Sequence, residues 1–293
     1  MTPLRQRMLD DMKVRNLASN TQASYLLQVS AFAKFFHQSP ERLGPEHIRT
    51  YQVHLTTVKR LAPSSLGIAV AALRFLYTVT LKQPWVAEEI PSPKKPQKLP
   101  VVLSAEEVAQ FLGCVSTLKQ RTLLSTIYAT GLRVSEATHL KVTDIDSQRM
   151  TLRVEQGKGQ KDRYVMLSPR LLENLRAYWK AVRPAGWLFP GEVAGQPIGR
   201  AAVEQACQMA CRRSGLTKPV TPHSLRHAFA VHLLEAGTDI RTIQLLLGHR
   251  GLSTTARYLK LATSKVCSAK SPFDLLGRPE SPAKLGGSPP QPH

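Results

Sequence analysis

The chain has 293 residues and a net charge of +20, from 40 Lys and Arg residues against 20 Asp and Glu residues. Its apolar content of 42% is ordinary for a globular protein, and its length indicates two domains. The charge favours a polyanionic partner, above all nucleic acid, over a membrane surface, because no strongly amphipathic basic helix ends in Trp or Phe.

The cysteines and the start of the chain indicate a reducing compartment. The spacing of Cys114, Cys207, Cys211 and Cys267 fits neither a disulfide framework nor a cysteine-rich zinc site. The stretch Met1 to Arg15 is polar, unlike a secretory signal, and no apolar run looks long enough to span a bilayer. We therefore expect a reduced, cytoplasmic protein without a membrane partner.

Residues 1–89 are expected to form a small helical domain. Ser19 or Asn20 is a candidate N-cap for a first helix, and Pro45 and Pro63 fit the first turns of two more. A linker follows at residues 90–100, IPSPKKPQKLP, whose prolines favour an extended segment. Three of its residues are candidate DNA contacts, with an ordinary solvated linker as the alternative: Lys94, Lys95 and Lys98.

Residues 101–276 are expected to form a second domain of mainly helical structure with a small β-sheet. Ser104 and Glu107 form a capping-box pattern ahead of a helix near 105–113, and Gly131 ends a helix near 119–129. The stretches VTDID, MTLRVE and RYVML between residues 142 and 167 alternate like strands. The chain then becomes helical after Pro169, and residues 277–293 have the Pro, Gly and Ser content of a disordered tail.

The stretch TPHSLRHAFAVHLL, residues 221–234, sets polar groups at the start of an apolar helix. If Thr221 caps the helix and Pro222 takes its first position, His223 lies in the first turn and Arg226 lies one turn later on the same side. An imidazole, a guanidinium and a helix N-terminus together suit a phosphate oxygen.

A zinc site is the alternative for this stretch, because His223 and His227 are four residues apart. Ser224 follows His223 where the general-base glutamate of a zinc protease motif would stand, and no third ligand is evident. We interpret His227 as structural or exposed, along with five other histidines: His37, His47, His54, His139 and His232.

Four stretches carry a more specific pattern: KLPVVLSAEEV, ATGLRVSEATHLKVTDID, QGKGQKDRYVML and PHSLRHAFAVHLLEAGTDIRTIQLLLGHRGLSTTARY. From about residue 15 to Tyr258 the chain resembles the tyrosine recombinases, also called phage-type integrases. Within that family it resembles the Xer-type enzymes, and its SPFDLLGRPE segment is more similar to integrases of mobile elements.

The resemblance implies a set of active-site residues. Tyr258 matches the nucleophile, Arg133 and Arg226 the two arginines that hold the phosphate, and His223 and His249 the two histidines. Lys158, on a glycine-flanked turn between two strands, matches the lysine that protonates the leaving 5′ oxygen, and Lys161 nearby is a further candidate DNA contact. Glu136 matches a carboxylate that supports the first arginine. The implied reaction forms a 3′-phosphotyrosyl ester and needs neither a metal ion nor ATP.

The resemblance also implies an assembly on double-stranded DNA. The two domains would form a C-shaped clamp, and four protomers on two sites would exchange strands through a Holliday junction. The segment from Val266 to Leu276 would pack either on a neighbouring protomer or on its own domain. Two alternatives stay open: a type IB topoisomerase-like enzyme that relaxes DNA as a monomer, and a catalytically silent DNA-binding accessory protein.

Overall fold

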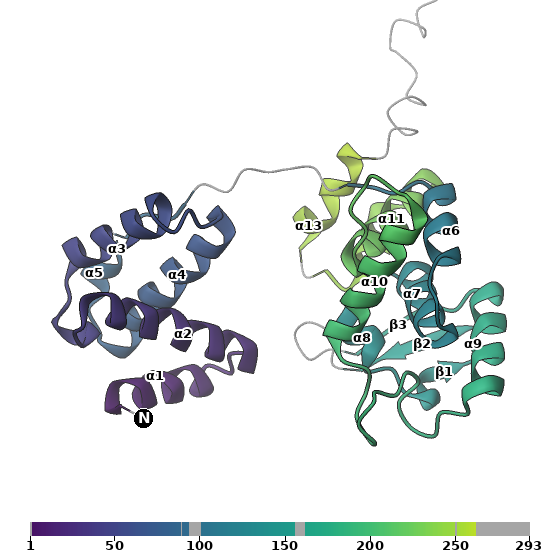
Figure 1. Cartoon of the computed structure of the whole chain (residues 1–293), viewed down its shortest axis with the longest axis horizontal. Coiled ribbons are helices and arrows are strands. Elements are labelled where there is room, and N and C mark those ends of the chain that lie inside the picture. Colours follow the sequence, from purple (N-terminus) through teal and green to yellow (C-terminus); the bar gives the residue numbers. More distant parts are fainter. Residues whose placement is uncertain (1, 89, 94–100, 156–161, 250, 262–293) are drawn as a thin grey trace, which may run out of the picture. The chain divides into compact units, whose positions relative to one another are not determined.

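The computed structural model describes residues 2–88, 90–93, 101–155, 162–249 and 251–261, and these fall into two compact units (Figure 1). The units are Met1–Lys98 and Leu99–His293. Several residues singled out in the sequence lie outside the described residues: Lys94, Lys95, Lys98, Lys158, Lys161, the segment 266–276 and the tail 277–293.

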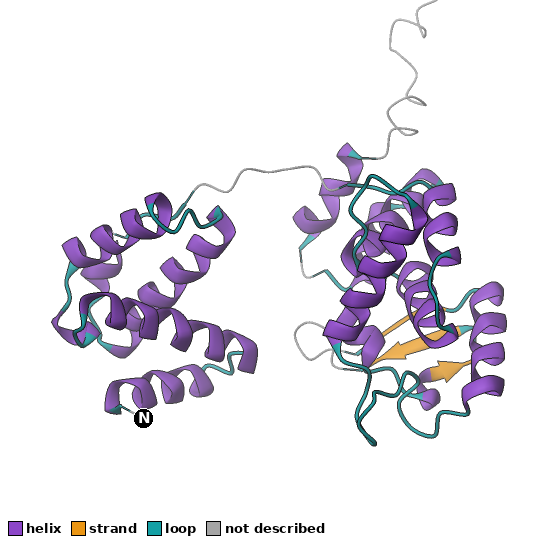
Figure 2. Ribbon diagram, viewed as in Figure 1, coloured by secondary structure: helices purple, strands orange, loops and turns teal. Residues whose placement is uncertain are grey.

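The described part of the first unit is helical throughout (Figure 2). Its elements are α1 (Pro3–Val14), α2 (Ser19–Phe36), η1 (Pro40–Arg42), α3 (Pro45–Thr57), α4 (Pro63–Phe75), η2 (Leu76–Thr80) and α5 (Pro84–Glu88). Four of the five α-helices begin with proline, whose fixed φ suits the first helical turn and whose missing N–H is not needed there. The starts at Pro45 and Pro63 confirm two predicted helix starts.

Helix α2 begins differently from the prediction. Ala18, rather than Ser19 or Asn20, occupies the N-cap position, and no side chain caps the helix. The carbonyl of Ala18 already accepts the backbone N–H groups of Thr21 and Gln22, so Ser19 is inside the first turn. The core of the unit lies between α2 and α4, where Phe32 and Leu73 are buried.

One continuous helix, Pro63–Thr80, is long and apolar enough to span a membrane by length and composition alone, with a mean hydropathy of 1.2. The prediction that no such run exists was therefore wrong. The core helix of a bundle passes the same test, and this helix is a core helix here. Its residues Leu73, Leu76 and Tyr77 are buried, and the Tyr77 hydroxyl donates to the carbonyl of Leu43 at 2.7 Å.

The second unit combines helices with a small antiparallel sheet (Figure 2). Its helical elements are α6 (Ala105–Gly113), α7 (Leu118–Thr130), α8 (Val134–Thr138), η3 (Val142–Asp144), α9 (Pro169–Val182), α10 (Arg200–Ser214), α11 (Pro222–Glu235), α12 (Ile240–Leu247), α13 (Leu252–Ala256) and η4 (Arg257–Lys260). The capping box is confirmed, because Ser104 and Glu107 bond each other's backbone N–H groups at 2.8 and 3.2 Å.

The sheet has the order β1-β2-β3, with strands β1 (Ile145–Asp146), β2 (Thr151–Val154) and β3 (Arg163–Met166). Leu152 pairs with both Ile145 and Val165, and its side chain is buried in the core. The first predicted strand is shorter than VTDID, because residues 142–144 form a 3-10 turn. The Asp144 carboxylate accepts the Lys141 backbone N–H at 2.8 Å and closes that turn.

Helices α7 and α11 pack against each other in the middle of the second unit, and the end of α7 requires a glycine. Gly131 has φ +64° at the C-cap, and a Cβ atom there would overlap the ring of Phe229 on α11. The Gly131 carbonyl also accepts a hydrogen bond from Arg226. This glycine therefore lets the two helices approach closely, and its carbonyl is the acceptor for the buried Arg226 side chain.

We predict that Gly131→Ala destabilises the protein by roughly 2–4 kcal/mol, the sum of left-handed backbone strain and overpacking. Urea unfolding followed by circular dichroism measures the change. Gly113→Ala is the matched control, because nothing lies within 4 Å of a Cβ atom at that helical position, and it should be neutral or slightly stabilising. Equal effects of the two substitutions would contradict the packing argument.

Candidate active site

The candidate site begins at the N-terminus of α11, where the predicted cap is confirmed. The Thr221 hydroxyl accepts the backbone N–H of Ser224 at 3.1 Å, and Pro222 takes the first helical position. His223 and Arg226 follow on α11, and both line a cavity of about 460 Å³ together with Arg133. The sequence thus places an imidazole and a guanidinium at the start of one helix, where both border this cavity.

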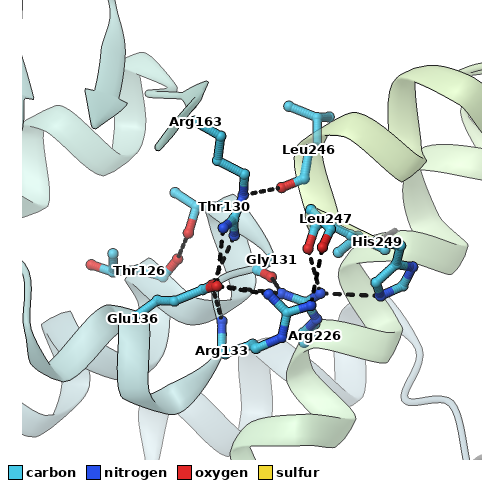
Figure 3. Close-up of polar contacts among 11 residues, drawn as sticks. Thr126, Thr130, Gly131, Arg133, Glu136, Arg163, Arg226, Leu246, Leu247 and His249 are labelled. Atoms are coloured by element: carbon cyan, nitrogen blue, oxygen red, sulfur yellow. Dashed lines mark hydrogen bonds and ion pairs between the residues drawn. The ribbon is translucent and has the colours of Figure 1, made fainter. Parts of the chain in front are cut away.

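Arg226 is buried, with only 1% of its side chain exposed, and its guanidinium joins three parts of the chain (Figure 3). It donates to the Gly131 carbonyl at 2.5 Å and to the Leu247 carbonyl at 2.6 Å, and it lies 3.1 Å from His249 Nε2. Burial and the charge of Arg133 lower the pKa of Arg226 to about 10, so it stays charged at neutral pH. An anion that reached it would be bound strongly.

Arg133 is the N-cap residue of α8, and the short helix is built around its pairing with Glu136. The Glu136 carboxylate accepts the Arg133 backbone N–H at 2.8 Å and its Nη1 at 2.7 Å. Arg133 Nη2 also donates to the Gly248 carbonyl at 3.3 Å. About 23% of the Arg133 side chain is exposed, so it is the more accessible of the two predicted phosphate-binding arginines.

A third arginine, Arg163 on β3, joins this cluster and was not predicted from the sequence. Its Nη1 and Nη2 donate to the two Glu136 oxygens at 3.0 and 2.7 Å, and its Nε donates to the Leu246 carbonyl at 3.1 Å (Figure 3). Burial raises the pKa of Glu136, but the hydrogen bonds and charges of Arg163 and Arg133 outweigh it and lower that pKa to about 2. Glu136 is therefore an anion at neutral pH.

His249 follows the end of α12 directly. Gly248 caps that helix with φ +60° and turns the chain so that the His249 ring faces Arg226. The other ring nitrogen, Nδ1, lies 2.8 Å from the Thr255 hydroxyl on α13. The two contacts hold the imidazole plane between α11 and α13.

Tyr258 lies in η4, and its hydroxyl lies 2.8 Å from His227 Nδ1. Only 2% of Tyr258 is exposed, and its ring stacks on that of His249 with centroids 6.5 Å apart. Burial raises the pKa of the phenol, although the charges of Arg226, Arg257 and Arg133 partly offset this. The hydroxyl is therefore protonated at neutral pH.

The histidine that contacts Tyr258 is His227, for which the sequence predicts only a structural or exposed position. Burial, His223 and Arg257 lower the pKa of His227 to about 4, so this imidazole is neutral. His223 lies next to it with ring centroids 4.3 Å apart, and burial and Arg226 also lower the pKa of His223. His232, by contrast, has a structural place, since it contacts the Tyr128 hydroxyl and the Leu103 carbonyl.

The described structure thus brings together six predicted site residues and two that were not predicted for the site. The six are Arg133, Glu136, His223, Arg226, His249 and Tyr258, and the two are Arg163 and His227. Lys158 and Lys161 lie outside the described residues. No group of three metal-ligating side chains occurs within the residues that the structure describes.

Two family models match the chain. Residues 101–265 match the Phage integrase family, and residues 4–87 match the phage integrase N-terminal SAM-like domain. A putative integrase/recombinase of Sinorhizobium fredii, y4qK, is 67% identical over 280 residues, which cover 95% of this chain and 91% of that protein. An integrase/recombinase of Escherichia coli is 32% identical and covers 94% of this chain and 96% of its own length.

Two solved structures share the fold. XerH recombinase bound to a palindromic difH substrate superposes with a TM-score of 0.70 at 24% identity, covering 90% of this chain and 83% of that chain. A lambda integrase dimer bound to a COC′ core site superposes with a TM-score of 0.71 at 18% identity, covering 86% and 95%. At these identities the likeness establishes the fold.

We predict that Glu136 stabilises the protein in a pH-dependent way. Its pKa is about 2 in the folded state against 4.5 for the free group, so the stabilisation is complete above about pH 4.5 and is lost as the pH falls toward 2. The shift corresponds to about 3 kcal/mol. Urea unfolding of the wild type and Glu136→Gln between pH 2 and 7 should give a difference in unfolding free energy that shrinks by that amount on acidification. A difference independent of pH would contradict the ionised pairing.

Proposed function

The chain belongs to the phage integrase family, the tyrosine recombinases, and on that premise we propose that it is a site-specific recombinase that cuts and rejoins double-stranded DNA. The observation that supports this best is that contacts link Arg133, Arg226, His249 and Tyr258, which span 125 positions of the sequence. Arg133 donates to the carbonyl that precedes His249, Arg226 lies 3.1 Å from the His249 ring, and that ring stacks on Tyr258. A protein that only bound DNA would not require a tyrosine hydroxyl beside two arginines.

In the proposed reaction Arg133 and Arg226 bind the non-bridging oxygens of the scissile phosphate. In the transition state of phosphoryl transfer these oxygens carry negative charge. Fixed guanidinium groups stabilise that charge better than water does, so they lower the barrier. His249 would complete the set from the end of α12. Glu136 would hold Arg133 without contacting DNA, because both of its oxygens are already bonded to arginine.

Tyr258 would attack phosphorus through its hydroxyl oxygen, and the bond between phosphorus and the 5′ oxygen would break. We assign the tyrosine proton to His223 and the protonation of the 5′ oxygen to Lys158. The product is a 3′-phosphotyrosyl ester and a free 5′-hydroxyl. Because the ester retains the energy of the broken bond, another 5′-hydroxyl can attack it and reseal the strand without ATP.

The contact between His227 and Tyr258 belongs to a resting state in this proposal. Burial raises the pKa of the Tyr258 phenol and lowers the pKa of the His227 imidazole to about 4, so transfer of the proton from Tyr258 to His227 is unfavourable. His227 therefore holds the hydroxyl without ionising it. A bound phosphate would add negative charge, which raises the pKa of the imidazoles and supports activation by the substrate itself.

The rest of the proposal concerns the assembly. We propose that the two units close on duplex DNA as a clamp and that Lys94, Lys95, Lys98 and Lys161 contact the DNA. We further propose that four copies act on two sites through a Holliday junction, in the cytoplasm and on the ends of a mobile element. The net charge of +20 supports a polyanionic substrate, and the names of the relatives support integration or recombination.

We predict that the wild type forms a covalent adduct with DNA and that Tyr258→Phe does not. The substrate is a duplex selected by binding from a random library and nicked beside the cleavage position, so that the cut fragment diffuses away. In EDTA and without ATP, adduct on a denaturing gel should fall by at least about 10³-fold in the variant, because the nucleophile is missing. Tyr164→Phe, at an exposed tyrosine of β3, is the matched control and should react normally.

The outcomes of this assay separate the alternatives. Binding without any wild-type adduct over several selected duplexes indicates a silent DNA-binding protein. Relaxation of plasmid lacking a selected site, by a monomer, indicates a topoisomerase-like enzyme.

We also predict that His227→Asn cleaves within about 3-fold of the wild type. His227→Ala should cleave about 10–100-fold more slowly, because the Tyr258 hydroxyl loses the partner that positions it and misplacing a reacting group can cost about 100-fold. The asparagine amide oxygen reproduces the hydrogen bond of His227 Nδ1 to Tyr258, and alanine does not. The rate of adduct formation at saturating protein is the measurement. If asparagine were as damaging as alanine, His227 would be the proton acceptor and the resting-state assignment would be wrong.

A further inference from the structure

Three arginines bind three consecutive carbonyls at the end of α12. Arg163 Nε donates to Leu246 at 3.1 Å, Arg226 Nη2 to Leu247 at 2.6 Å and Arg133 Nη2 to Gly248 at 3.3 Å. Figure 3 shows this end of α12 facing the arginine cluster. The last carbonyls of a helix have no partners inside the helix and carry the negative end of its dipole, so cations bind them favourably. The position of the residue that follows is thereby fixed.

Arg163 makes the most complete set of these contacts. Its two terminal nitrogens form a fork on both Glu136 oxygens, while the Arg133 guanidinium donates to only one of them. The side chain is 13% exposed. A Cβ atom at Gly248 would lie 3.1 Å from its guanidinium, so the residue before His249 packs directly on Arg163. Arg163 thus contacts both the Glu136 carboxylate, which pairs with Arg133, and the backbone that directly precedes His249.

The geometry also separates Arg163 from the phosphate-binding groups. Arg133, His223 and Arg226 line the cavity at the start of α11, and Arg163 is not among the residues around that cavity. Three of its five N–H groups point to Glu136 and Leu246. A guanidinium bound in this way acts on the reaction through its neighbours.

We propose that Arg163 is a positioning residue: it holds Glu136 and the end of α12 so that Arg133, Arg226 and His249 face one phosphate. This inference rests on the proposed function. Losing the fork would leave Glu136 with Arg133 as its main partner and would release the Leu246 carbonyl. Both changes loosen groups whose alignment supplies the stabilisation of the transition state.

The test is the rate of adduct formation on two versions of the selected nicked duplex. One carries the ordinary scissile phosphate, and the other carries a methylphosphonate, in which a methyl group replaces one non-bridging oxygen and removes the charge. Arg163→Met should lower the rate about 10–100-fold on phosphate, because a displacement of about 1 Å in groups that must be aligned can cost about 100-fold. On methylphosphonate the loss should shrink to within about 3-fold, because there is less charge for the arginines to stabilise.

Three further measurements make the result specific. Binding of the duplex by Arg163→Met should stay within about 3-fold of the wild type, since the guanidinium does not contact DNA. Arg163→Lys should remain closer to the methionine variant than to the wild type, because an ammonium group cannot form the fork. Arg153→Met is the matched control. It removes an arginine of the neighbouring strand that pairs with Asp144 and Glu155 on the sheet, and it should react normally.

Several results would overturn the inference. These are an unchanged rate on phosphate, an equal loss on both substrates (which indicates a fold defect alone), and a loss that follows weakened binding. Additive effects of Arg163→Met and Glu136→Gln would also overturn it, because residues that act through one another are coupled. If Arg163→Met does not fold, the lysine variant gives the same comparison. A wild type without adduct overturns the proposed function itself, whereas an adduct that Arg163 does not influence overturns only this inference.

Discussion

One buried carboxylate, Glu136, organises the positive charge of the second unit. Within the described residues it is the only carboxylate in an ion pair with Arg133, Arg163 or Arg226, at 2.7, 2.7 and 3.9 Å. Three guanidinium groups and one carboxylate leave a local net charge of +2. Like charges that close together would repel strongly in a poorly solvated interior, so the carboxylate is a condition for their assembly. The remaining charge is available to an anion.

The backbone supplies the second part of the arrangement. Arg226 reaches the Gly131 carbonyl at the end of α7 and the Leu247 carbonyl at the end of α12, so one side chain joins two helix C-termini. Helix ends carry unpaired carbonyls in any case, and the arginines satisfy them in place of water. Some N–H groups of each guanidinium therefore bind helix-end carbonyls and hold the helices together, and the others are available to bind an anion.

Much of this arrangement could be predicted because local signals determine it. The Thr221 cap, the helix-ending Gly131 and the order of arginines, histidines and tyrosine each follow from short stretches of sequence. Arg163 and His227 were missed because their roles depend on packing between distant segments: Arg163 is 27 residues from Glu136, and His227 is 31 residues from Tyr258. The alternation of RYVML could have placed Arg163 on the inner face of its strand with Val165. The role of an inward-facing arginine, however, cannot be predicted until the carboxylate that pairs with it is known. The start of α2 was mispredicted because Ser19 and Asn20 are equally good caps in sequence, and the backbone used neither.

The three arginine-bound carbonyls at the end of α12 fix the number of residues between that helix and His249. Successive residues of an α-helix are rotated by about 100° and advanced by 1.5 Å. Inserting or deleting a single residue near Leu246 would turn each carbonyl away from its own arginine and present it to another. The imidazole would then be displaced as well. The length of this short segment is therefore part of the active-site geometry.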